Sequence, residues 1–188
     1  RDAHGFMVSS EFAAFLVKDP DAMTILTELH DTGFNEPDWK NSLKTTGVEV
    51  LRAPCLTLLG ATNEEHLNEA IPSSAVSGGF VARCFLVMSE KKGELNPLTE
   101  RPTSIPDHQE LAGYLKDLSR TKGEFKWSGK AKANYNKWYL SFMSEEHTDP
   151  TGTLERIHDQ VLKVAMLESL SESPALILED RHLGKSLH

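Results

Sequence analysis

Residues 55–63 have the sequence CLTLLGATN, a continuous apolar run that ends in small and polar residues. Such a run is typical of a central strand that is buried on both faces of a parallel sheet. Two similar runs are GFMVSS at residues 5–10 and FVARCFLVM at residues 80–88, the second of which follows Gly78-Gly79. Together the three runs predict an α/β fold that contains a mostly parallel sheet.

Helical patterns separate and flank these strands. Three helices are expected, over residues 11–17, 21–30 and 63–71. Ser10 stands where it can cap the first of them. The polar stretch 35–46 predicts an irregular segment, and residues 48–51 alternate only weakly.

The composition changes after the third apolar run. Residues 91–106 contain three prolines and many charges, which predicts a linker. Beyond it, apolar residues recur at helical spacing, and residues 176–178 predict either a short strand or an extended approach to a last helix. We therefore expect a sheet-containing domain over 1–90 and a mainly helical, lid-like region over 107–188.

The overall composition limits the classes of protein that the chain can represent. Its 188 residues are 39% hydrophobic and 26% charged, as in folded globular proteins. No apolar run approaches the roughly 18 residues of a membrane-spanning helix, and no signal peptide opens the chain, so we expect a cytoplasmic protein without a membrane partner. Cys55 and Cys84 lack a spacing motif, which predicts no metal site. A formal net charge of -8 means that any contact with nucleic acid must be local.

Polar residues follow the strands in an order that suits phosphate chemistry. Glu11 follows the first strand, Asn63 follows the second, and Arg83 comes shortly after Gly78-Gly79. In an open parallel sheet, active-site groups gather at the carboxyl ends of the strands. A carboxylate there can polarise an attacking water, an amide can orient it, and an arginine can neutralise charge that develops on a γ-phosphate.

Each of these residues also has a simpler structural interpretation. A glutamate after a strand is more often the first residue of a helix, where it interacts with the helix dipole. Asn63 can cap the helix that begins beside it. Arg83 can be a surface residue of a strand. The order of the three residues along the chain carries more weight than any one of them.

Residues 4–88 resemble the second half of the motor domain in primase-helicase proteins of phages and mobile elements. The core of that family is similar to the RecA/AAA+ P-loop ATPases. The resemblance rests on the motifs Ser9-Ser10-Glu11-Phe12, LTLLGATN at 56–63 and SGGFVAR at 77–83. It extends more loosely to residues 156–166, which are similar to the lid-like end of the family.

The resemblance implies that Glu11 is a Walker B glutamate, Asn63 a sensor residue and Arg83 an arginine finger. For the intact protein it implies ATP and Mg²⁺ as cofactors, DNA as a partner and a homo-oligomeric ring. Ser10 is an exception, because the family has a metal-contacting Asp at this position. A serine can bind a phosphate or a magnesium-bound water but brings no charge, which puts metal binding at this position in doubt.

The chain lacks the phosphate-binding loop G-x-x-x-x-G-K-[ST]. Gly184-Lys185-Ser186 has the ending of this motif, but Glu179 stands where the first glycine should be. Without the loop there is no amide cradle for the phosphates and no lysine beside them. Since the first residue is Arg1, we expect the loop upstream, and we expect this segment alone to bind no cofactor and hydrolyse no ATP.

Two segments are candidates for contact with nucleic acid. Residues 120–140 are basic and contain interleaved aromatic residues on which bases could stack, although the same rings also fit one helical stripe and would then form a core. The polar segment 39–46 occurs where ring helicases often carry insertions that face the central pore; the other interpretation is a solvated loop. The candidate residues are Lys126, Lys130 and Lys132 in the first segment and Lys40 and Lys44 in the second.

These observations predict a fragment of an ATP-dependent DNA helicase or primase-type motor that acts in replication of a mobile element and is inactive alone. An alternative is a degenerate ATPase-like module that binds DNA or protein without catalysis, which the missing loop and Ser10 favour. A third interpretation, an α/β domain of unrelated function, also remains open.

Overall fold

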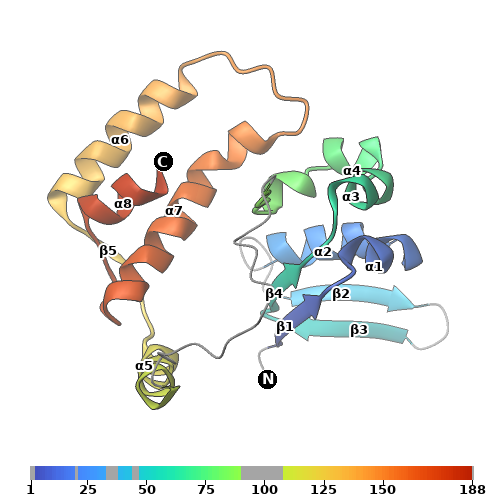
Figure 1. The fold of residues 1–188 in the computed structure, drawn as a ribbon, viewed down its shortest axis with the longest axis horizontal. Helices are drawn as coiled ribbons and strands as arrows, with labels where there is room; N and C mark the ends of the chain where they lie inside the picture. Colours follow the sequence, from blue (N-terminus) through green and yellow to red (C-terminus); the bar gives the residue numbers. More distant parts are fainter. Residues whose placement is uncertain (1–2, 20, 33–37, 44–46, 90–107, 188) are drawn as a thin grey trace, which may run out of the picture. The chain divides into compact units, whose positions relative to one another are not determined.

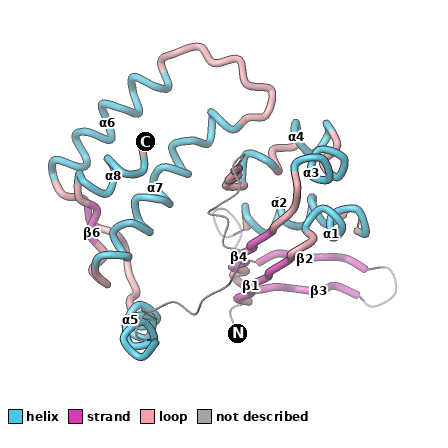
Figure 2. Tube along the Cα trace, viewed as in Figure 1, coloured by secondary structure: helices cyan, strands magenta, loops and turns pink. Residues whose placement is uncertain are grey.

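The computed structural model describes residues 3–19, 21–32, 38–43, 47–89 and 108–187. The chain forms two compact units (Figures 1 and 2). Unit 1 comprises Arg1–Phe85 and Thr148–Leu154, and unit 2 comprises Leu86–His147 and Glu155–His188. The predicted linker, 91–106, lies outside the described residues. No helix within the described residues combines the length and the apolar character needed to cross a membrane.

Unit 1 contains a pair of parallel strands, β1 (His4–Ser9) and β4 (Cys55–Gly60). Their register pairs His4 with Cys55 at one end and Ser9 with Gly60 at the other. Two helices, α1 (Phe12–Lys18) and α2 (Ala22–Asp31), follow β1 along the chain. Two of the three predicted apolar strands are therefore present, and the predicted α/β class is confirmed.

One face of the β1–β4 pair packs on the core of unit 1. Leu58 points into this core, which also takes residues from α1 and α2 and from α3 (Glu64–Ala70). Phe12 and Leu16 are four positions apart on α1 and are both buried, as the helical spacing of apolar residues requires. The buried residues of the cluster are Phe12, Ala13, Leu16, Ala22, Ala70 and Phe80.

The opposite face of the same strand pair is open to solvent. Phe6, Val8 and Leu59 share this face and are 69%, 64% and 60% exposed. The prediction that 55–60 is buried on both faces is therefore wrong for the described structure. A continuous apolar run indicates that the side chains on both faces of a strand favour burial. It does not show that residues of the described chain cover both faces.

An antiparallel hairpin lies between α2 and β4 in the chain. It consists of β2 (Asp38–Leu43) and β3 (Gly47–Arg52), with Trp39 opposite Leu51 and Lys40 opposite Val50. The expectation of an irregular segment over 35–46 is thus wrong for residues 38–43, and residues 48–51, which alternate only weakly in sequence, lie within β3. Every residue of β3 is exposed, which agrees with its weak alternation in sequence.

The third predicted strand, at 80–88, is absent from the structure. Helix α4 (Ser73–Ser77) ends instead in a Schellman motif, in which Gly79 N–H donates to the Val76 carbonyl and Phe80 N–H to the Ala75 carbonyl. Gly79 has the left-handed φ of +77° that this motif requires. A short 3₁₀ helix, η1 (Val81–Arg83), follows. The two glycines therefore end a helix and do not introduce a strand.

Unit 2 is mainly helical, as expected from the spacing of its apolar residues. Its elements are α5 (His108–Arg120), β5 (Lys126–Trp127), α6 (Gly129–Met143), most of α7 (Thr153–Glu172), β6 (Ile177–Leu178) and α8 (Asp180–Ser186). Of the two alternatives predicted for 176–178, the short strand is present as β6 and pairs in parallel with β5. The buried residues of its core are Ala131, Val161, Ala165, Leu178 and Leu183.

Candidate nucleotide site at the carboxyl ends of β1 and β4

The ends of β1 and β4 lie side by side because the two strands are parallel and in register. Ala61 N–H donates to the Ser9 carbonyl at 2.8 Å, and Phe12 N–H donates to the Ala61 carbonyl at 3.0 Å. These bonds continue the pairing beyond the strands. Glu11 and Asn63 consequently project from the same edge of the pair, hereafter the carboxyl edge, as the sequence predicts.

Glu11 stands at the N-cap position of α1. Its side chain makes no capping hydrogen bond, is exposed, and has no hydrogen-bond or ion-pair partner within the described residues. The predicted capping by Ser10 is not observed, because the helix begins one residue later than this role needs. The Glu11 carboxylate is thus accessible to an incoming ligand at the carboxyl edge.

Asn63 caps α3 and uses both ends of its amide to do so. Its Oδ1 accepts a hydrogen bond from His66 N–H at 2.8 Å, and its Nδ2 lies 3.1 Å from His66 Nδ1. A shallow open hollow of about 670 Å³ lies beside it, lined by Asn63, Glu64, Glu65 and Asn68. These contacts use one lone pair of Oδ1 and one N–H of Nδ2, so each end of the amide keeps a second hydrogen-bonding position with which it can orient a water.

Arg83 is engaged within its own chain. Its Nε donates to Asp31 Oδ1 at 2.9 Å, its Nη2 donates to Asp31 Oδ2, and its Nη1 donates to the Gly79 carbonyl at 2.7 Å. Only 9% of the side chain is exposed. A carboxylate that binds both edges of a guanidinium fork occupies the positions that two phosphate oxygens would take.

Arg83 is held by Asp31, the last residue of α2. Leu29, near the end of α2, lines a hollow of about 200 Å³ together with His4 and Cys55, which are the first residues of β1 and β4. Asp31, the partner of Arg83, comes two residues after Leu29. Glu11 and Asn63 thus share the carboxyl edge, whereas the described contacts of the Arg83 side chain are with Asp31 and Gly79 and join it to neither of them.

The lysines predicted to contact nucleic acid differ in their surroundings. Lys40 is exposed on β2, and Lys44 lies outside the described residues. Lys126 and Lys132 are exposed near the start of α6, whereas Lys130 forms an ion pair with Asp180 at 2.8 Å. The hydrogen bond to Asp180 raises the pKa of Lys130.

The aromatic residues of the same segment pack on one another. Ring centroids lie 5.2 Å apart for Trp127 and Tyr135, 5.7 Å for Tyr135 and Trp138, and 5.6 Å for Trp138 and Phe142. Trp127, Tyr135 and Trp138 also pack on the buried core of unit 2. This arrangement agrees with the core interpretation of the aromatic stripe.

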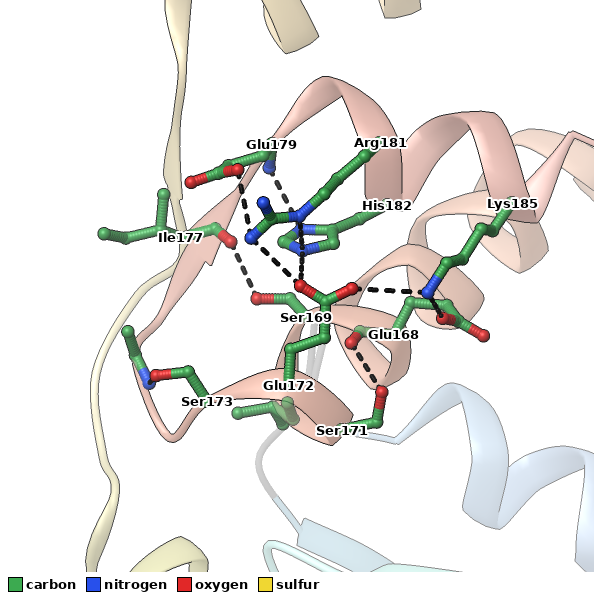
Figure 3. Close-up of polar contacts among 12 residues, drawn as sticks. Glu168, Ser169, Ser171, Glu172, Ser173, Ile177, Glu179, Arg181, His182 and Lys185 are labelled. Carbon is green, nitrogen blue, oxygen red and sulfur yellow. Dashed lines mark hydrogen bonds and ion pairs between the residues drawn. The ribbon is translucent and has the colours of Figure 1, made fainter.

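A polar cluster between α7 and α8 had no counterpart among the predicted sites (Figure 3). Glu172 lies at its centre and interacts with His182 Nε2 at 3.3 Å, Arg181 Nη2 at 2.9 Å and Lys185 Nζ at 3.3 Å. Lys185 also binds Glu168 at 2.8 Å. The hydrogen bond from His182, followed by that from Lys185, lowers the pKa of Glu172.

His182 lies on the buried side of this cluster. It is 3% exposed, and its Nδ1 accepts a hydrogen bond from Glu179 N–H at 3.1 Å as part of a capping box. Since Nδ1 accepts, a neutral ring carries its proton on Nε2, for which the Glu172 carboxylate is the acceptor. Arg181 Nε lies 3.3 Å from the same nitrogen and could donate to it only in the other tautomer. Acids and bases spaced four apart on the two helices were the available sequence signal. Lys185, the lysine of Gly184-Lys185-Ser186, lies in α8 and takes part in this contact between α7 and α8.

Within the residues that the structure describes, no group of three or more His, Cys, Asp or Glu side chains is arranged to hold a metal ion. Comparison with protein-family models, with curated proteins and with solved structures finds no match to this chain. The resemblance to primase-helicase motor domains thus stays a prediction from the sequence motifs.

Proposed function

We propose that unit 1 forms part of the nucleotide-hydrolysing site of a DNA-dependent motor, in which Glu11 activates the attacking water and Asn63 orients it. The observation that carries this proposal is the in-register parallel pairing of β1 and β4. It makes the two residues neighbours at the edge where open α/β sheets bind their ligands. ATP and Mg²⁺ would be held there by a phosphate-binding loop from another part of the intact protein.

The open face of the β1–β4 pair supports this proposal. Parallel sheets occur almost only with both faces covered, and isolated two-stranded sheets are marginally stable. The exposure of Phe6, Val8 and Leu59 fits a sheet that is completed by further strands and helices. In the proposed motor, these would come from the portion that carries the phosphate-binding loop.

DNA and a ring of identical subunits complete the proposal. The β2–β3 hairpin presents exposed Lys40 to the pore, and Lys126 and Lys132 of unit 2 offer further contacts to phosphates. Within the described residues, Arg83 makes no contact with Glu11 or Asn63 of its own chain, which fits a role at the site of a neighbouring subunit. The motor would act in the cytoplasm during replication of a mobile element.

The test is Glu11→Gln in the full-length protein. Loss of the carboxylate removes the group that polarises water, so ATP turnover should fall by about 100-fold or more, while ATP binding is kept. The matched control is Glu69→Gln, an exposed glutamate on α3, which should leave turnover unchanged. Unchanged turnover in Glu11→Gln would remove the basis for the proposed role.

A second candidate function is a module that binds DNA or protein without catalysis. Two contacts favour it: Asn63 is committed to the cap of α3, and Arg83 is paired with Asp31. The candidates differ in what precedes Arg1 in the full-length sequence. A strand followed by a phosphate-binding loop there decides for the motor, and the lack of one decides for the binding module.

A further inference from the structure

The last turn of α2, residues 28–31, contacts strand β2 of the hairpin and Arg83. Glu28 Oε2 accepts a hydrogen bond from Trp39 Nε1 on β2 at 2.9 Å. Leu29 lines the same hollow as Leu51 on β3. Asp31 binds Arg83 through two hydrogen bonds. Three nearly consecutive residues thus connect two parts of unit 1 that are distant in the sequence.

This turn is well suited to transmit a displacement. Glu28 and Asp31 are three positions apart, so they are neighbours on the helix surface. Thr32 closes the helix beneath them, because its N–H and its hydroxyl both donate to the Glu28 carbonyl, at 2.9 and 2.7 Å. A movement of Trp39 that shifts Glu28 therefore shifts Asp31 as well.

Arg83 has a closely fitted position next to this turn. The Gly79 carbonyl holds Nη1, and a Cβ placed on Gly79 would lie 2.7 Å from the same nitrogen. Small movements of Asp31 consequently change how the guanidinium is held. While the Asp31 carboxylate binds the guanidinium of Arg83, this guanidinium cannot bind a phosphate of a nucleotide in a neighbouring subunit.

We propose that the last turn of α2 makes Arg83 responsive to the hairpin. DNA that displaces the hairpin moves Glu28 through Trp39, and Asp31 then releases Arg83 to the phosphates of the adjacent subunit. Glu28 and Asp31 are positioning residues in this scheme. The inference rests on the proposed motor function and adds to it the route by which DNA stimulates ATP turnover.

The first arm of the test is Trp39→Phe in the full-length protein. This change keeps a ring but removes the N–H that binds Glu28. The ratio of ATP turnover with single-stranded DNA to turnover without it should fall at least about five-fold, the lower range of measured couplings. Basal turnover and DNA affinity should stay as they are. Glu49→Gln, an exposed change on the same hairpin, is the control and should keep the ratio.

The second arm is Asp31→Asn, which weakens the hold on Arg83. Basal turnover should rise toward the DNA-stimulated rate, and Trp39→Phe added to it should have no further effect. A purely structural role of the ion pair would instead lower turnover in a folded variant, and that result overturns the inference. If Asp31→Asn does not fold, Trp39→Phe decides alone.

The outcomes separate this inference from the proposed function. Turnover that is lost in Glu11→Gln, combined with full DNA stimulation in Trp39→Phe, overturns the coupling and leaves the motor intact. Turnover that does not depend on Glu11 overturns both. Loss of stimulation in Trp39→Phe with unchanged DNA affinity supports the coupling.

Discussion

Each unit of the molecule contains one pair of parallel strands, and the two pairs differ in how they are covered. The β5–β6 pair is two residues long, and its Leu178 is 2% exposed beneath the helices of unit 2. The β1–β4 pair is six residues long and covered on one face only. The short pair adds to a core that is formed mainly by helices, whereas the long pair resembles part of a larger sheet.

The comparison predicts its largest effect in the core of unit 2. Leu183, 2% exposed, packs in one cluster with Leu178, so Leu183→Ala should lower the free energy of unfolding of unit 2 by about 3 kcal/mol. Urea denaturation can follow this through Trp127 and Trp138 in a Trp39→Phe background. Leu140→Ala, at an exposed position of α6, should change it by less than about 0.5 kcal/mol. Equal effects of the two substitutions would contradict the assigned core.

A smaller effect is expected on the open face of the β1–β4 pair. Val8→Thr combined with Leu59→Thr should leave the free energy of unfolding of unit 1 within about 0.5 kcal/mol, because both side chains already contact water. Sedimentation velocity should show less self-association, since the apolar patch is reduced. Leu58→Thr on the inner face should destabilise unit 1 clearly more. Equal destabilisation by the outer and inner changes would mean that the outer face is covered in solution.

The smallest effect concerns the pH dependence of unit 2. Hydrogen bonds from His182 and Lys185 lower the pKa of Glu172 in the folded chain. Its stabilising contribution is therefore complete above the ordinary pKa of a glutamate and is lost as the pH falls through the lower folded value. Glu172→Gln should make the fall in unfolding free energy between about pH 6 and pH 3 shallower. Glu146→Gln, an exposed change, should keep the wild-type slope, and an unaltered slope in Glu172→Gln would contradict the role of these bonds.

Local patterns explain which parts of this fold were predictable. Strands β1 and β4 and helices α1 to α3 were visible as apolar runs and helical stripes. The hairpin was not, because its first strand lies in a polar stretch and its second alternates only weakly. Gly78-Gly79 was assigned to a strand entrance, although a glycine pair after a short helix is also the signal of a helix end.

The candidate site was predictable to the same degree. Glu11 and Asn63 lie at the same edge because they follow strands that pair in register, and strand order made that expectation possible. The pairing of Arg83 with Asp31 joins residues 52 positions apart in the chain, for which the sequence holds no local signal. The α7–α8 cluster depends likewise on how two helices pack.

The open face of the β1–β4 pair also has a consequence for temperature. The association of apolar surfaces is driven by entropy near room temperature and weakens on cooling. Contacts made through Phe6, Val8 and Leu59 should therefore loosen in the cold, while the ion pairs between α7 and α8 are much less affected. A change of temperature should thus affect apolar contacts between unit 1 and other molecules more than it affects the helix contacts of unit 2.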